Sequence, residues 1–254
     1  MELSKAFDKY TIIARIFPAL LIILSCLFSI YATSPNLITS NLPSFLATIF
    51  ISFGALYFVS NFCRTLGRKE EEKLIENWGG LPTTLILRHS DNTLTNLTKK
   101  RYHSFLERNV PHIGSFPSPD EETQNHNKAD EIYSSSIDWL KEQRRDKEKY
   151  SLLHEENIQY GFRRNLLGVK IIGIYLCIAS ILLIFVNNIY SIKLDTISIE
   201  KIKSVIKNLT TFQYMALFFD IIFLLCWIFV VNKNWVKEAG FQYAKTLLKS
   251  IETS

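Results

Sequence analysis

Four long apolar runs constrain this chain more than any other feature of its sequence. Each has about 20 mostly apolar residues, the length that a helix needs to cross the roughly 30 Å hydrocarbon core of a bilayer. None contains more than one charged residue. A helix also satisfies its own backbone hydrogen bonds, as a spanning segment must. The runs therefore predict four transmembrane helices in two pairs, over residues 10–31, 42–62, 166–190 and 212–231.

The connections between the runs predict their orientation. Residues 33–41 carry no charge, whereas Arg64, Arg68 and Lys69 closely follow the second run. Because Lys and Arg accumulate on the cytoplasmic side, we expect both termini and the middle of the chain in the cytoplasm, with the helices in a bacterial inner membrane. The other outside connection, residues 191–211, contains lysines. We expect an amphipathic helix on the outer surface there, or a plain extension of the long helix.

The middle of the chain has the composition of a soluble domain, since residues 64–165 hold seventeen basic and seventeen acidic side chains. Helical periodicity continues from the second run as far as Gly79 and Gly80, which are good helix terminators. We expect Thr83 or Thr84 to cap a short helix and Thr98 to cap another. Residues 110–127 contain three prolines and are expected to form an exposed connecting loop.

A long helix is expected over residues 128–149, with helical structure continuing into the third run. No strand pattern competes with these helices. The sequence therefore predicts an all-α membrane protein with four transmembrane helices in two pairs and an α-helical cytoplasmic domain inserted between them. Its expected parts are a first transmembrane pair (1–65), a cytoplasmic sensor domain (66–165), a second transmembrane pair (166–232) and a cytoplasmic C-terminal amphipathic helix (233–254).

Asp220 is the sharpest chemical signal, because it is the only charge in the fourth run. A carboxylate at such a depth costs at least about 2.5 kcal/mol unless it faces a pore, a polar partner or another subunit. We expect Asp220 to line a pore. The alternative is a carboxyl group that reaches the interface, or is protonated and hydrogen-bonds a neighbouring helix.

Basic residues in the middle of the chain are the candidates for binding an anionic ligand. Phosphate needs donors that converge from several elements, and these clusters can supply them. A solvated surface is the alternative, and lipid headgroups alone would explain the last pair. The candidate ligand-binding residues are Arg88, His89, Lys99, Lys100, Arg101, His103, Arg163 and Arg164. Arg144 with Arg145 forms a further cluster of the same kind.

Catalytic and metal motifs are weak in this sequence. His89, Asp91 and His103 suggest metal ligands, and Ser90 with His103 suggests a hydrolytic pair, but solvated or capping side chains explain them better. There is no His-x-x-x-His, nucleophile elbow or phosphate-cradling glycine loop. We therefore predict no enzyme, no metal site and no cofactor.

Four strings resemble signatures of uncharacterised bacterial membrane proteins: WGGLPTT (78–84), LRHSD (87–91), KKRYH (99–103) and YGFRRN (160–165). The plan of the whole chain is also similar to that of membrane effectors of bacterial anti-phage systems, among them the channel of the Hailong defence system, which short DNA oligomers gate. This resemblance implies a homo-oligomer of about four subunits around a pore. It also implies a ligand made by a partner nucleotidyltransferase.

Together these features predict an oligomeric, ligand-gated ion channel or membrane-permeabilising effector of anti-phage defence. A nucleotide or oligonucleotide bound to the cytoplasmic domain would control it. The second hypothesis is a non-conducting membrane scaffold that docks a soluble partner enzyme, with Asp220 serving only helix packing.

Overall fold

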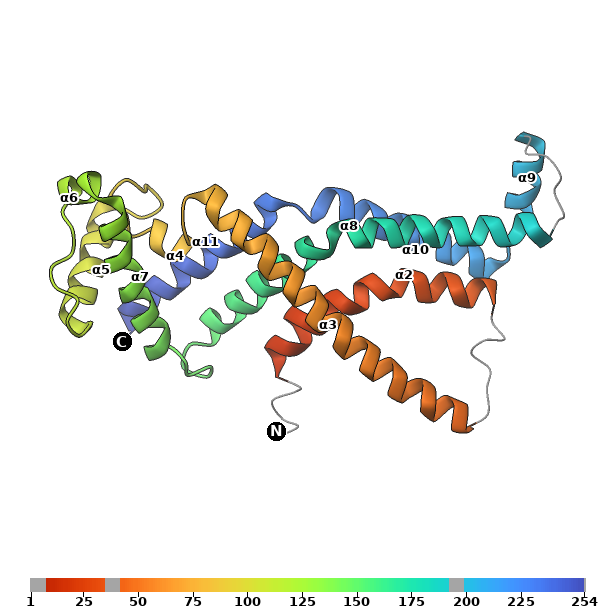
Figure 1. Ribbon diagram of the computed structural model, residues 1–254, viewed down its shortest axis with the longest axis horizontal. Helices are drawn as coiled ribbons and strands as arrows, with labels where there is room; N and C mark the ends of the chain where they lie inside the picture. Colours follow the sequence, from red (N-terminus) through yellow and green to blue (C-terminus); the bar gives the residue numbers. More distant parts are fainter. Residues whose placement is uncertain (1–7, 35–41, 192–198, 254) are drawn as a thin grey trace. The chain divides into compact units, whose positions relative to one another are not determined.

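The computed structural model describes residues 8–34, 42–191 and 199–253, and does not describe the side chains of residues 42–53, 191 and 199–202. Over these residues the chain is all-helical, without a strand (Figure 1). The elements are η1 (Thr11–Ile16), α2 (Phe17–Thr33), α3 (Leu42–Trp78), α4 (Pro82–Leu85), α5 (Asn96–Asn109), α6 (Pro119–Gln124), α7 (His126–Gln143), α8 (Ser151–Ser191), α9 (Ile199–Lys207), α10 (Thr211–Leu225), η3 (Cys226–Val230), α11 (Lys233–Lys249) and η4 (Ser250–Thr253).

Among the residues that the structure describes, three stretches of helix are long and apolar enough to cross a membrane: Thr11–Thr33, Ser151–Tyr190 and Thr211–Val230. They correspond, to within two residues at the ends, to the first and fourth apolar runs and contain the third. The second run lies in α3, where the backbone is helical but side chains 42–53 are outside the described residues. The structure therefore supports an apolar, all-helical protein with three candidate spans.

Internal contacts divide the chain into two compact units. Unit 1 contains Met1–Lys69 and Arg164–Asn232, and unit 2 contains Glu70–Arg163 and Lys233–Ser254. Both α3 and α8 run without interruption from one unit into the other. The C-terminal segment, expected as a domain of its own, belongs to unit 2.

In unit 1, α3 and α8 approach each other at two glycines. A Cβ atom on Gly168 would collide with the backbone of Leu66 and Gly67, and one on Gly67 would collide with Asn165. The Asn165 side-chain amide also donates to the Ala14 carbonyl at 2.6 Å. Glycine is therefore required at this crossing, because only a residue without a side chain lets the two backbones come so close.

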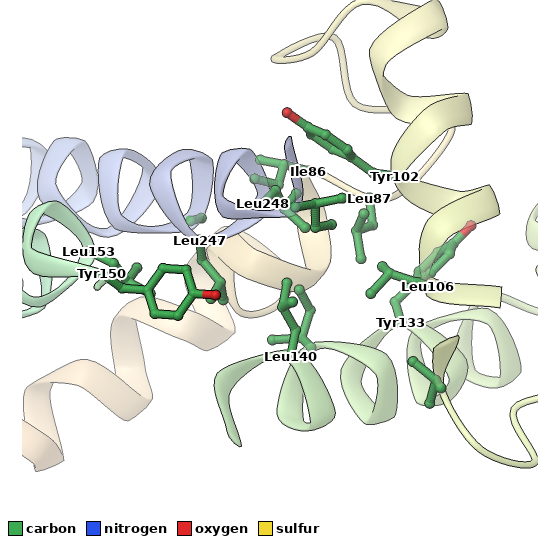
Figure 2. Close-up of a cluster of buried hydrophobic side chains, with 14 of the residues drawn as sticks. Ile86, Leu87, Tyr102, Leu106, Tyr133, Leu140, Tyr150, Leu153, Leu247 and Leu248 are labelled. Atoms are coloured by element: carbon green, nitrogen blue, oxygen red, sulfur yellow. The ribbon is translucent and has the colours of Figure 1, made fainter. Parts of the chain in front are cut away.

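The core of unit 2 joins segments that are far apart in the sequence. Leu140 of α7 and Leu248 of α11 point into the same cluster as Leu87 and Leu106 (Figure 2). All four are fully buried. Apolar burial of this kind stabilises a domain by about 25 cal/mol per Å² of surface removed from water, so α11 is an integral part of unit 2.

Several expected helix ends need correction. Thr83 and Thr84 lie inside α4, whose N-cap is Leu81, because Pro82 occupies the first helical position. The cap of α5 is Thr95, whose hydroxyl accepts the Thr98 amide. Helix α7 ends at Gln143, short of the expected residue 149. The stop at Gly79 is confirmed, since this residue adopts a φ of 79°.

Candidate anion site in unit 2

The link from α4 to α5 is built around the buried ammonium of Lys99. This side chain is 2% exposed, and its Nζ donates to the carbonyls of Arg88 at 2.6 Å and Asp91 at 2.5 Å. Burial lowers the pKa of Lys99 below its ordinary value, against the opposing effect of the Asp91 and Glu122 carboxylates. Lys99 therefore orders residues 88–91, which we call the cradle.

Arg88 is held by an ion pair across unit 2. Its Nε donates to one Asp130 oxygen at 2.8 Å and its Nη2 to the other at 2.5 Å. The same Nη2 donates to the Gly79 carbonyl at 2.8 Å. The two parallel contacts with Asp130 make this geometry bidentate, and the hydrogen bond to Asp130 is the main reason why the pKa of Arg88 is raised.

The cradle holds a carboxylate that comes from α6. Glu122 is 2% exposed, and its Oε2 accepts the His89 amide at 2.8 Å and the Tyr133 hydroxyl at 2.7 Å. Its Oε1 accepts the Ser90 amide at 3.3 Å and the Ser90 hydroxyl at 3.4 Å. Burial acts to raise the pKa of Glu122, but these hydrogen bonds outweigh burial and lower it. The carboxylate is therefore held in its charged form.

Two histidine rings, those of His89 and His103, lie at the cradle. His103 is 7% exposed and its Nε2 lies 2.8 Å from the Leu87 carbonyl. Burial lowers its pKa to about 4, so the ring is neutral at pH 7. The His89 Nε2 lies 2.9 Å from the Pro117 carbonyl. In the described part of the chain, no group of three or more His, Cys, Asp or Glu side chains is placed to hold a metal ion.

The outer surface of α5 presents two further predicted cations, Lys100 and Arg101, together with Arg108. Its residues Leu97, Lys100, Arg101, Ser104 and Arg108 recur at three- and four-residue spacing and line an open depression of about 550 Å³ together with Glu252. We call these five residues the α5 stripe. Lys100 and Arg108 are exposed, and Arg101 pairs with Glu252 at 3.1 Å. Such an exposed pair is weak, so an anionic ligand can replace Glu252.

Arg144 takes part in a separate basic surface at the turn between α7 and α8. Its Nε donates to the Ser250 hydroxyl at 3.1 Å, and its guanidinium lies 4.9 Å from the centre of the Tyr150 ring. Arg145 pairs with Glu142. These contacts hold the cluster against its own domain.

Arg163 and Arg164 contact different partners. Consecutive residues of a helix point about 100° apart, and here they fall in different units. The Arg163 Nη1 donates to the Trp235 carbonyl at 3.0 Å, and its guanidinium lies 4.9 Å from the Trp235 ring. Arg164 is buried and donates to the Asn165 side chain at 3.3 Å.

Asp220 lies in unit 1 with no exposed surface. Its Oδ2 accepts the Ser29 hydroxyl of α2 at 2.8 Å, and its Oδ1 is buried without a hydrogen-bond partner among the described residues. Other polar side chains join α2 to α8 nearby, since the Cys177 thiol donates to Ser25 and the Ser180 hydroxyl to Cys26. We call this set, together with Ser29 and Asp220, the polar seam.

The structure thus brings together Arg88, His89, Lys99 and His103 at the cradle, and places Lys100 and Arg101 on the opposite surface of α5. Sequence reasoning missed Glu122, Asp130 and Tyr133. Glu122 sits in a segment that reads as an exposed acidic loop, and the capping box of Ser118 and Glu121 was the signal for a helix there. Its partners in the cradle lie more than thirty residues away, which no spacing rule reveals.

Comparisons of the chain with protein-family models, with curated proteins and with solved structures found no match.

Proposed function

We propose that the chain is a ligand-gated membrane channel, or permeabilising effector, of the bacterial inner membrane. In this proposal it crosses the membrane four times, keeps both termini and unit 2 in the cytoplasm, and assembles as a homo-oligomer. The observation that carries the proposal is Asp220, a buried carboxylate among apolar helices with only one of its two oxygens hydrogen-bonded by the described residues.

The polar seam places the Asp220 carboxylate beside other polar side chains of the apolar helices. An isolated charge inside a membrane is costly, so such residues usually pair with one another or mark an ion pathway. Here the described residues supply one hydroxyl donor and no cationic partner in a hydrogen bond or ion pair. Asp220 therefore has the capacity to attract a cation that enters between the helices.

The α5 stripe is the surface that we assign to the gating ligand. Lys100 and Arg108 are eight residues apart on one helical face, a rise of about 12 Å. Cations spaced in this way match an extended anion with several phosphates better than a single ion. A nucleotide or short oligonucleotide has this chemistry, and the resemblance to anti-phage effectors suggests a partner nucleotidyltransferase as its source.

The link between ligand and pathway is the continuity of α3 and α8. Both helices belong partly to unit 1 and partly to unit 2, so a rearrangement of their ends in unit 2 is transmitted to their membrane segments. The ligand shifts the equilibrium between a conducting and a closed arrangement to the extent that it binds one more tightly than the other.

Ion flux into liposomes tests the channel. We expect the purified chain to pass monovalent cations and Asp220→Asn to reduce this flux at least tenfold, because the amide keeps the shape but removes the charge. Cys226→Ser, an exposed position on η3, is the matched control and should conduct as the original chain does. A well-folded oligomer without flux, both alone and with added oligonucleotide, would refute the channel.

Oligonucleotide binding at stated salt tests the stripe. We expect the double variant Lys100→Gln with Arg101→Gln to weaken binding, and to reduce the slope of log affinity against log salt by about 1.4, the value for two phosphate contacts with a single strand. Lys73→Gln with Lys245→Gln removes the same charge from exposed positions elsewhere. Equal losses in both double variants would show that the stripe is not the site.

The second candidate is a non-conducting scaffold that docks a soluble enzyme. The hydrogen bond from Ser29 to Asp220 favours it, because that bond joins α2 to α10 and would serve packing alone. Under this hypothesis Asp220→Asn lowers the stability of unit 1 and Ser29→Ala lowers it similarly, while neither variant changes membrane conductance.

A further inference from the structure

We propose that the cradle is a binding site for a terminal phosphate and that Glu122 occupies it as an internal substitute for this ligand. The segment 110–125, which carries Glu122, then acts as a displaceable strap. This inference rests on the proposed function for its biological meaning, since it adds a terminal phosphate to the chemistry of the gating ligand.

The donors in the cradle are arranged as for a tetrahedral oxyanion. Two consecutive backbone amides, those of His89 and Ser90, point at the same carboxylate, and the hydroxyls of Ser90 and Tyr133 complete the set. Successive amides of this kind form a concave anion site. A carboxylate fills it with two oxygens, whereas a phosphate offers three oxygens and up to two charges to the same donors.

The charges around the cradle favour an anion. The charge of the Glu122 carboxylate acts favourably on both the Arg88 guanidinium and the Lys99 ammonium. The Lys99 ammonium hydrogen-bonds backbone carbonyls of the cradle. If Glu122 left without a replacement, this buried ammonium would lose one of the two carboxylates that balance it. An arriving phosphate restores that balance.

The strap packs against the core of unit 2 through Val110 and Ile113 and has a cavity beside its second half. A cavity of about 250 Å³ lies beside the strap. It is lined by Pro117, Gln124 and Asn125 of the strap and by Ala129 and Ile132 of α7. The strap begins in left-handed backbone, with φ of 55° at His112 and 76° at Gly114. A non-glycine residue in that region is uncommon, so the native path of the strap relies on its contacts.

Those contacts converge on the cradle. Phe116 packs against the rings of His103 and Tyr133, the Pro117 carbonyl faces the His89 ring, and Glu122 fills the donors. Outside this region, the Phe116 amide donates to Glu107 at 3.2 Å. Displacement of Glu122 therefore removes the contacts that the strap makes with the cradle, while Val110 and Ile113 still hold its first residues against the core.

A tethered carboxylate competes strongly, because a short linker keeps it at an effective concentration in the millimolar range. An external phosphate must overcome this competition in the original chain. Glu122→Gln removes the competing charge, so we expect inorganic phosphate to bind this variant at least tenfold more tightly. Asp120→Asn, an exposed carboxylate on the same short helix, is the control and should bind phosphate as the original chain does.

The experiment uses the full chain in nanodiscs of phosphatidylcholine and follows amide hydrogen exchange. We expect added phosphate to accelerate exchange over residues 110–125 in the original chain while the His89 and Ser90 amides stay protected; potassium chloride at equal ionic strength should have no effect. Replacing part of the lipid with phosphatidic acid, without free phosphate, tests the headgroup source: faster strap exchange there would identify a lipid phosphate as a ligand of the same cradle.

Unchanged strap exchange at saturating phosphate, together with no gain of phosphate affinity in Glu122→Gln, would overturn the proposal. Glu122 would then have a structural role only. If Glu122→Gln does not fold, Glu122→Asp replaces it, because the shorter acid withdraws from the donors and should also bind phosphate more tightly. Conductance plays no part in these readouts. If phosphate accelerates strap exchange but the chain passes no ions, the channel is refuted and the phosphate site stands. If the chain passes ions but phosphate changes neither strap exchange nor affinity, the phosphate site is refuted and the channel stands.

Discussion

Acidification should destabilise unit 2 through His103, whose ring stays neutral in the folded chain. Burial lowers its pKa from 6.5 to about 4. Between these values the unfolded chain binds a proton that the folded chain does not, so stability is fully present above pH 6.5 and is lost as pH falls towards 4. The loss is about 2.5 kcal/mol when the pH falls from 7 to 4.5, since one pKa unit corresponds to about 1.4 kcal/mol.

Urea denaturation of the full chain in detergent, followed by hydrogen exchange in α7, measures this slope. The variant His103→Gln keeps a donor for the Leu87 carbonyl but does not titrate, so it should be less stable at pH 7 and nearly independent of pH from 7 to 4.5. His126→Gln, at an exposed position, should retain the original slope. Below pH 4.5 the lowered pKa of Glu122 adds a further loss in the same direction. Parallel slopes for His103→Gln and the original chain would refute the reasoning.

Two further substitutions test the packing. Lys99→Met should destabilise unit 2 by about 2–4 kcal/mol, because the carbonyls of the cradle lose a buried charged donor. Lys100→Met, on the exposed side of α5, should change stability by less than about 0.5 kcal/mol. The urea midpoints of the two variants measure this difference. Gly168→Ala should lower the stability of unit 1 by about 1–3 kcal/mol, because the new Cβ would meet the backbone of Gly67. Gly54→Ala, a position with open space around it, should be neutral or stabilising. Equal thermal midpoints for the two variants would argue against the close crossing of α3 and α8.

Local features of the sequence were sufficient for the long apolar helices, but not for α6, which lies in a segment expected as a loop. Apolar length predicted the three candidate spans that the structure describes, and Gly79 marked the end of α3, because both depend on residues close together in the chain. Helix caps were less certain. Thr83, Thr84, Thr95 and Thr98 all have hydroxyls that can cap, and the backbone angles decide which one does.

Sequence alone could not separate structural cations from available ones. Lys99 and Lys100 are neighbours, yet α5 turns the first into the core and the second to solvent. Arg88 pairs with Asp130, 42 residues away, and Asp220 with Ser29, 191 residues away.

The sequence by itself determined that this chain is helical, has apolar segments of membrane-spanning length, and carries one carboxylate in its last apolar run. Tertiary structure decided which basic residues are buried, that Glu122 fills the cradle, and that the Ser29 hydroxyl donates to Asp220 within the polar seam. The physical reason is range: helix formation and apolar length act between near neighbours, whereas a buried charge depends on donors that only the folded chain brings within hydrogen-bond distance.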